Sequence, residues 1–229
     1  PVIASGHISD SFEDQVHELT AMTGTGVDAV ILITNRLAKE EESDEVWLAN
    51  LQALLDKLPS QVPLGFYECP YPYKRVLSPK VTRWCAESGR FFFLKDTCCD
   101  IQQIKEKLDI CRDSNLKLYN ANTSTLLESL RYGATGYSGV MANMQCDLYA
   151  WLCAHPQDEK AEELSQELTI CSLIERQLYP VNAKYYLSLE GLSITTECRS
   201  KRAEDLTPTF RTEVEMLRQI TKRMADKYL

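Results

Sequence analysis

Short apolar runs alternate with amphipathic stretches along the first 140 residues of the chain. Apolar side chains between the runs recur at helical spacing, as Ile101, Ile104 and Leu108 do. The runs predict six strands, at residues 1–4, 29–33, 63–69, 90–97, 116–120 and 135–140. Strands that alternate with helices at intervals of about 30 residues are typical of a parallel α/β protein with right-handed crossovers.

The predicted helices begin and end at recognisable signals. Ser43 is an N-cap, and Ser78-Pro79 supplies a cap followed by a first helical residue. The ranges predicted are 9–23, 43–58, 79–87, 100–111, 126–132, 145–154, 159–178, 180–191 and 208–227. No strand is predicted beyond residue 144. Six β/α units fit a doubly wound sheet, whereas a complete (β/α)₈ barrel needs eight strands.

The run RFFFLKDT, residues 90–97, is the most informative strand. Its four consecutive apolar residues predict a strand that is buried on both faces. Lys95 lies at its carboxyl end, where parallel α/β folds place their chemistry. This lysine is either a surface residue or a desolvated amine whose lowered pKa frees the lone pair to attack a carbonyl. The local sequence leaves both interpretations open.

Composition narrows the classes of function. A formal net charge of −8 and a pI near 5.0 argue against nucleic acid or an anionic membrane as a partner. No apolar run is long enough for a membrane helix. Nine scattered cysteines without a CxxC predict reduced, buried thiols in a cytoplasmic protein, and three isolated histidines give no zinc motif. Without a GxGxxG turn or a P-loop, we expect neither a metal nor an organic cofactor.

Six short motifs together resemble the dihydrodipicolinate synthase/N-acetylneuraminate lyase family in order and spacing. They are Pro1-Val2-Ile3-Ala4, Gly65-Phe66-Tyr67-Glu68-Cys69-Pro70, Leu94-Lys95-Asp96-Thr97, Gly133-Ala134-Thr135-Gly136, Ala142-Asn143 and Tyr179-Pro180-Val181-Asn182-Ala183-Lys184. The resemblance implies a (β/α)₈ TIM barrel with a C-terminal helical extension. It also implies a lysine that forms a Schiff base with pyruvate or a related 2-oxo acid, and a tyrosine that shuttles protons.

The resemblance also implies a numbering of the strands. Pro1–Ala4 is similar to the family's third strand, so the first two β/α units are expected to be absent from this chain. Residues 1–156 are then units three to eight of the barrel, and residues 157–229 are the helical extension. A truncated chain and a degenerate paralogue both explain this start. We expect the former, with roughly 60 to 80 further residues before Pro1, enough for two β/α units.

Lys95 and Tyr67 are the expected catalytic residues. The resemblance makes Lys95 the amine that condenses with the C2 carbonyl of a 2-oxo acid. Tyr67 ends the neighbouring strand, where its phenol is expected to relay a proton. Thr97 follows Lys95 by two residues, on the same side of an extended strand, and either binds a substrate hydroxyl or caps the next helix.

The other candidate residues follow the last two predicted strands. Gly136 and Gly139 permit a close approach of backbone to ligand, although tight packing would explain them equally well. Asn120 and Asn122 are expected to reach a polar substrate. Together with Thr97 they form the expected substrate-binding set.

Departures from the family pattern bear on the substrate. Leu37 stands where the synthases carry a relay tyrosine, Pro72 where they carry a carboxylate-binding arginine, and Ala121 where they carry a glycine. Nearby, Arg36, Lys74 and Arg75 are possible anion ligands. These losses favour a lyase or aldolase that converts a 2-oxo-3-deoxy sugar acid to pyruvate and an aldehyde.

Other classes of function stay open at this point. They are dihydrodipicolinate-synthase-type condensation, a catalytically inactive barrel kept for binding, an interaction module with an acidic helix, and a metal-dependent aldolase. The last needs a ligand cluster that the sequence does not offer. The family's habit implies a homodimer or homotetramer that acts on a small 2-oxo acid.

Overall fold

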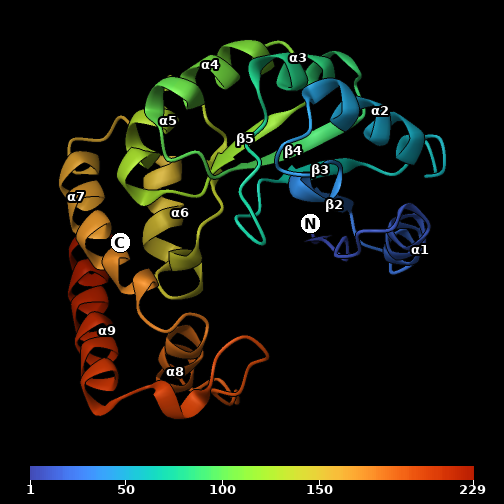
Figure 1. Ribbon diagram of the computed structural model, residues 1–229. Coiled ribbons are helices and arrows are strands. Elements are labelled where there is room, and N and C mark those ends of the chain that lie inside the picture. Colours follow the sequence, from blue (N-terminus) through green and yellow to red (C-terminus); the bar gives the residue numbers. More distant parts are fainter. The chain divides into compact units, whose positions relative to one another are not determined.

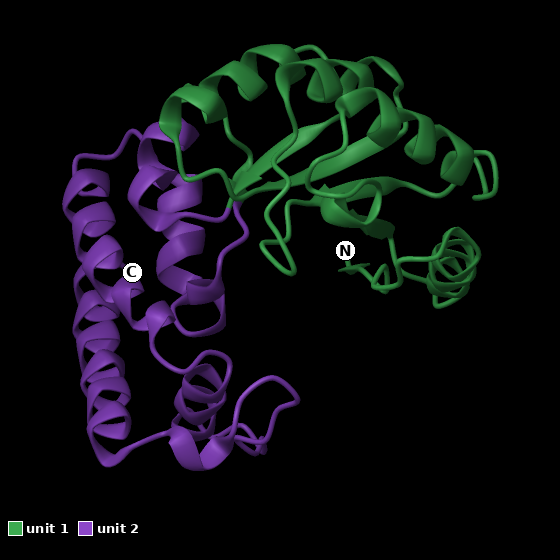
Figure 2. Ribbon diagram, in the orientation of Figure 1, with its two compact units in different colours: residues 1–120, 132–136 green, residues 121–131, 137–229 purple.

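The structure is a computed structural model that describes residues 1–229. The chain forms two compact units, shown in different colours in Figure 2. Unit 1 comprises residues 1–120 and 132–136, and unit 2 comprises residues 121–131 and 137–229. The predicted boundary at residue 156, between barrel and extension, stays a prediction.

Unit 1 consists of strands and helices in strict alternation. Its elements are β1 (Ile3–Ala4), α1 (Phe12–Thr23), β2 (Ala29–Ile33), α2 (Asp44–Leu55), β3 (Leu64–Tyr67), α3 (Pro79–Glu87), β4 (Phe91–Asp96), α4 (Ile101–Cys111) and β5 (Lys117–Asn120). The side chains of Ser11, Ser43, Ser78 and Asp100 each accept a backbone N–H of the helix that they precede. The helix starts therefore follow from local sequence. The first and third strands are shorter than predicted.

The strands of the sheet follow one another in chain order, β1-β2-β3-β4-β5-β6, and β1 to β5 pair in parallel. The last, β6 (Gly136–Tyr137), begins at the end of unit 1. The sheet of unit 1 curls, and α2, α3 and α4 cover one of its faces (Figure 1). A doubly wound sheet would reverse its strand order at a switch point. The sequential order corrects that alternative and gives an α/β half-barrel.

The helix-covered face of the sheet contains the core of unit 1. Leu32, Phe66, Leu94 and Leu118 are register partners across β2 to β5, and none is more than 1% exposed. Trp47 of α2 packs on Phe66 with ring centroids 5.5 Å apart. Because side chains alternate along a strand, the residues on either side of this row point to the opposite face. Those residues form the site described below.

A β-bulge at the start of β4 corrects the prediction that this strand is buried on both faces. Leu64 pairs with Phe91, but Gly65 pairs with Phe93, so Phe92 is an extra residue without a register partner. Phe92 is 43% exposed as a result. A Cβ on Gly65 would lie 2.7 Å from Ile31 Cδ1 and 2.8 Å from Phe93 Cβ, so only glycine fits beside the bulge.

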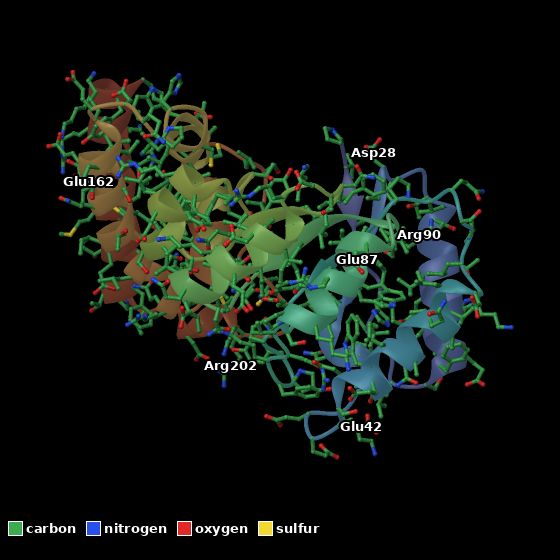
Figure 3. The ribbon with its side chains drawn as sticks, turned by 90° about the horizontal axis from the view of Figure 1, so that it is seen from above. Asp28, Glu42, Glu87, Arg90, Glu162 and Arg202 are labelled. Atoms are coloured by element: carbon green, nitrogen blue, oxygen red, sulfur yellow. The ribbon has the colours of Figure 1, made fainter.

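The opposite edge of the sheet is tied by Arg90, the residue before β4. Its guanidinium donates to the carbonyls of Pro59 (3.1 Å), Val62 (3.2 Å) and Ser60. Figure 3 labels Arg90 and Asp28, which directly precede β4 and β2 at the edge where the parallel strands begin. These contacts fix the loop that leads into β3. The polar side chains of the candidate site lie at the other edge.

Unit 2 is helical. Its helices are α5 (Leu126–Tyr132, whose last residue belongs to unit 1), α6 (Cys146–Ala154), α7 (Ala161–Cys171), α8 (Val181–Leu189) and α9 (Pro208–Tyr228), with 3₁₀ turns at Thr123–Thr125, Val140–Asn143, Ser172–Arg176 and Ala203–Asp205. These helices pack around a hydrophobic core separate from that of unit 1, which includes Leu148, Leu164, Leu168, Val214 and Leu217. No helix of the structure combines the length and apolar composition needed to cross a membrane.

Three predictions on elements and thiols are wrong in detail. The predicted helix 159–178 ends at Cys171, where the Ser172 hydroxyl donates to the Thr169 carbonyl (2.8 Å) and a 3₁₀ turn follows. The predicted strand 135–140 is reduced to Gly136–Tyr137, because the next 3₁₀ turn begins at Val140. Cys99 and Cys146 are exposed, so not every thiol is buried.

Candidate active site

The site lies on the face of the unit 1 sheet that α2, α3 and α4 leave uncovered, at the carboxyl edge. Ile33, Tyr67, Lys95 and Tyr119 are register partners on β2, β3, β4 and β5. Tyr67 is the last residue of β3, and Lys95 and Tyr119 are the next-to-last residues of their strands. Parallel register therefore places one lysine between two tyrosines where α/β folds bind their ligands.

Lys95 lies against the ring of Tyr67. Its Nζ is 4.1 Å from the ring centroid, within cation–π range, and both side chains are half-buried. Phe93, two residues before Lys95 and on the same face of β4, stacks on Tyr119 with ring centroids 4.7 Å apart. The amine of Lys95 is thus bordered by aromatic surface. This arrangement brings together the two residues that the sequence predicts as catalytic.

Tyr119 is a member of the row that sequence reasoning missed. For the predicted strand 116–120, the candidate residue from the sequence is its last residue, Asn120. The alternation of side chains could have identified Tyr119, since it precedes the strand end by one residue, as Lys95 does on β4. A Cβ on Gly136 would lie only 3.2 Å from Tyr119 Cδ1. The absence of a side chain at Gly136 therefore leaves space for the Tyr119 ring.

Asn120 lies on the other face of the sheet from Lys95. It pairs in register with Asp96 and is fully buried. The structure therefore does not bring Asn120 to the Lys95 side chain. Register partners share a face and successive residues of one strand alternate, so Tyr119 lies on the face of Lys95 and Asn120 on the face of Asp96.

Thr97 is buried, and its polar groups already have partners in the fold. Its N–H donates to Glu68 Oε2 (2.8 Å), and its hydroxyl donates to the Glu68 carbonyl (2.7 Å). The N-cap of α4 is Asp100, so the alternative that Thr97 caps this helix is wrong. The Thr97 oxygen keeps acceptor capacity, and a role toward a substrate hydroxyl stays a prediction.

Asn122 and Gly139 belong to unit 2, where both make local contacts. Asn122 Oδ1 accepts the Thr125 N–H (3.2 Å) and the Ser124 hydroxyl (2.6 Å), which caps a 3₁₀ turn. A Cβ on Gly139 would collide with the Tyr137 hydroxyl and lie 2.5 Å from the Ala121 carbonyl oxygen. Packing thus requires the glycine, and the substrate-binding roles of both residues stay predictions.

A buried ionic triad, formed by Glu68, Asp96 and Lys107, lies on the helix-covered face of the sheet. Lys107 of α4 places Nζ 2.6 Å from Glu68 Oε1 and 2.6 Å from Asp96 Oδ2. None of the three side chains is more than 3% exposed. Two carboxylates thus share one ammonium group, and sequence reasoning did not identify any of the three as functional.

The triad shifts the titration of its members. Burial raises the pKa of Glu68 above its usual value, while the Lys107 ammonium opposes this rise and the Asp96 carboxylate adds to it. Burial alone would lower the pKa of Lys107, but the two carboxylates outweigh it and hold that pKa above its usual value. Lys107 is therefore charged at neutral pH.

The cations that the sequence offers as anion ligands are engaged within unit 1. Arg36 pairs with Asp10, Arg75 donates to the carbonyls of Lys39 and Glu42, and the Lys74 ammonium donates to the Thr97 carbonyl (2.7 Å). Arg36 also lines a pocket of about 470 Å³ together with Leu37 and Pro72. Leu37 is 2% exposed and packs in the core, so it offers no hydroxyl to this region.

Both the sequence and the fold match a known protein family. The model of the Dihydrodipicolinate synthetase family matches residues 2–220. No curated protein sequence matches the chain. A dihydrodipicolinate synthase from Bacillus anthracis is 22% identical, with a TM-score of 0.82 over 96% of this chain and 74% of that one.

Two further structures with this fold contain pyruvate. A chloride-inhibited dihydrodipicolinate synthase from Acinetobacter baumannii, complexed with pyruvate, is 21% identical, with a TM-score of 0.81 over 97% of this chain and 75% of its own. YagE, a prophage protein of the dihydrodipicolinic acid synthase family from E. coli K12, also in complex with pyruvate, is 16% identical, with a TM-score of 0.82 and the same coverage.

Proposed function

We propose, since this chain belongs to the dihydrodipicolinate synthetase family, that it is a class I aldolase or lyase in which Lys95 forms a Schiff base with a 2-oxo acid. The observation that carries the proposal is the neighbouring pair at the carboxyl edge, Lys95 and Tyr67, with Nζ 4.1 Å from the ring centroid. Pyruvate in the A. baumannii and YagE structures supports a 2-oxo acid as ligand.

The chemistry assigned to these residues is an imine-assisted cleavage. The neutral amine of Lys95 adds to the C2 carbonyl, and loss of water gives a protonated imine. When the C3–C4 bond breaks, its electron pair moves into the imine and forms an enamine, while the C4 hydroxyl gives up its proton and becomes an aldehyde. Tyr67 accepts and passes on that proton. Protonation at C3 and hydrolysis by water release pyruvate and restore the amine.

The complete architecture of the enzyme is part of the proposal. The six strands are assigned to units three to eight of a (β/α)₈ barrel, and residues 157–229 to the family's helical extension. The sequential parallel sheet and its curl support this assignment. A cytoplasmic location and a homodimeric or homotetrameric state stay predictions of the resemblance.

The proposed substrate is a 2-oxo-3-deoxy sugar acid. Condensation with an amino-acid-derived aldehyde calls for a cation that binds its carboxylate, and an arginine fork suits that purpose. Pro72 offers no donor there, and Leu37 is buried in the core. Arg36 is paired with Asp10, so it is not a free cation for a substrate carboxylate. A sugar-derived aldehyde needs hydroxyl partners instead, for which the Thr97 oxygen is a candidate.

A turnover screen tests the proposed function. The protein is incubated with a panel of 2-oxo-3-deoxy sugar acids, pyruvate release is measured, and condensation of pyruvate with aspartate semialdehyde is assayed in parallel. We expect pyruvate release from at least one sugar acid, loss of release in Lys95→Ala, and little condensation. Efficient condensation without cleavage would assign the protein to the synthases. No turnover in either assay, with a folded protein, would favour a binding barrel.

A further inference from the structure

The triad is attached to the residues that directly follow the two proposed catalytic residues. Glu68 follows Tyr67 at the end of β3, and Asp96 follows Lys95 on β4. Alternation along the strand sends these carboxylates to the helix-covered face, whereas Tyr67 and Lys95 point to the uncovered face. On the helix side Lys107 contacts both carboxylates at 2.6 Å. One ammonium group therefore links the two strands directly behind the site.

Glu68 extends this link to the segments that leave the strands. Its Oε1 accepts the N–H of Leu77, which precedes α3, at 2.9 Å. Its Oε2 accepts the N–H of Thr97, just past Lys95, at 2.8 Å. The Glu68 N–H in turn donates to the Lys95 carbonyl at 3.3 Å. A single buried carboxylate thus fixes the chain after β3 and after β4.

From this geometry we propose that Lys107 is a positioning residue, which through its contacts with Glu68 and Asp96 holds Tyr67 and Lys95 in reacting geometry. Lys107 does not touch the substrate in this proposal, which rests on the proposed function of Lys95. The geometric requirement is strict in general, because a displacement of about 1 Å in a reacting group can lower a rate by about 10²-fold.

The contacts of the Glu68 side chain depend on whether its carboxyl group is ionised. The three groups at hydrogen-bond distance from its oxygens are all donors, so none of them could accept the proton of a neutral Glu68. Burial already raises the pKa of Glu68, and the Lys107 ammonium is the group that opposes this rise. Without Lys107 the largest opposition to that rise is lost, so we expect Glu68 to keep its proton to a higher pH than in the wild type.

Two thiols lie close to the triad, and the Lys74 ammonium donates to the carbonyl of Thr97, the residue after Asp96. Burial raises the pKa of Cys98 to about 12 and that of Cys111 to about 11. Cys98 lies beside Asp96, and Cys111 follows Lys107 by one helical turn on α4. Neither thiol changes charge between about pH 6 and about pH 9. A new pH dependence in that range therefore reports on the carboxylate pair.

The experiment measures the rate of imine formation with pyruvate, by borohydride trapping, between about pH 6 and about pH 9. The variants are Lys107→Met and the triple variant Glu68→Gln/Asp96→Asn/Lys107→Met, which removes every charge of the triad. Lys105→Met is the matched control, a lysine on the same helix outside the triad. Each rate is divided by the wild-type rate at the same pH, so that pH effects common to all the proteins cancel.

We expect Lys107→Met to form the imine about 10²-fold more slowly than wild type at neutral pH. The ratio should rise with pH, by at most about tenfold per pH unit, until Glu68 has lost its proton. The triple variant should be slow with a pH-independent ratio, and Lys105→Met should match wild type. A folded Lys107→Met protein with wild-type rates at every pH would overturn the proposal. So would the same pH-dependent ratio in the triple variant.

Amide hydrogen exchange separates this proposal from the proposed function. Protection of the Leu77 and Thr97 amides should fall in Lys107→Met at about pH 6 and recover at higher pH. If wild type fails to trap pyruvate while this exchange pattern appears, the proposed function fails and the linkage by Lys107 stands. Unchanged protection of both amides contradicts the linkage. If Lys107→Met does not fold, Glu68→Gln takes its place, with reduced protection and slow trapping at every pH as the expected result.

Discussion

The Nζ atom of Lys95 lies 4.1 Å from the centre of the Tyr67 ring, and the two residues are register partners on adjacent parallel strands. The ring therefore contributes packing and a cation–π contact in addition to its hydroxyl. Substitution by phenylalanine keeps the ring and removes only the hydroxyl. Ring and proton-transfer roles can be separated experimentally for this reason.

Tyr67→Phe should lower turnover of the sugar acid by about 10²–10⁴-fold, the usual scale for the loss of a proton-transfer group. Imine trapping with pyruvate should remain detectable, because the amine and the ring beside it are unchanged. Steady-state kinetics and trapping on the same preparation check this. Tyr71→Phe, at a residue that is 78% exposed, is the control. Unchanged turnover in Tyr67→Phe would remove Tyr67 from the proton relay.

Gly65→Ala should destabilise unit 1 by about 1–3 kcal/mol, the usual cost of overpacking. The new Cβ would lie 2.8 Å from the Phe93 carbonyl oxygen, a backbone atom that cannot rotate away. Chemical denaturation of wild type and variant measures the change. In the control Gly24→Ala, the new Cβ meets nothing closer than 3.4 Å and the φ is −74°. Equal destabilisation by the two substitutions would contradict the bulge geometry.

His7 should make stability fall on acidification. Burial lowers its pKa below 6.5, and its Nδ1 accepts the Ile33 N–H at 2.9 Å, which requires the neutral ring. Because the folded pKa lies below the unfolded one, the contribution is complete above pH 6.5 and is lost as the pH falls through the folded pKa. Denaturation of wild type and His7→Gln across this range should converge in acid. A constant difference between them would contradict the assignment.

The sheet could be predicted from sequence because it rests on local signals. Apolar runs marked β2 to β5, and the caps Ser43 and Ser78 marked helix starts that the structure confirms. The bulge at Phe92 could not be predicted, since it depends on how β4 pairs with its neighbour β3. Periodicity also does not reveal the early end of α7 at Cys171, where the Ser172 hydroxyl donates to the Thr169 carbonyl.

The candidate site was predicted in part. Lys95 and Tyr67, which the sequence singles out at the ends of two predicted strands, lie beside each other in the structure, and their catalytic roles stay predictions. Polarity at the strand end favours Asn120 in the sequence, but the register places Tyr119 and not Asn120 beside Lys95. The triad had a sequence signal, since Lys107 lies three residues after Ile104 and thus on the apolar face of its helix. That signal becomes meaningful only when Glu68 and Asp96 are known to lie opposite.

The measurement that tests the central claim most directly is covalent trapping at Lys95. The protein is incubated with saturating pyruvate and borohydride, digested, and its peptides are mapped by mass spectrometry. The proposed chemistry predicts one pyruvate-derived adduct, on the peptide that carries Lys95, which disappears in a folded Lys95→Ala variant and persists in Lys117→Ala, a control on the neighbouring strand. An unmodified Lys95 peptide, or an adduct on a different lysine, would contradict the account.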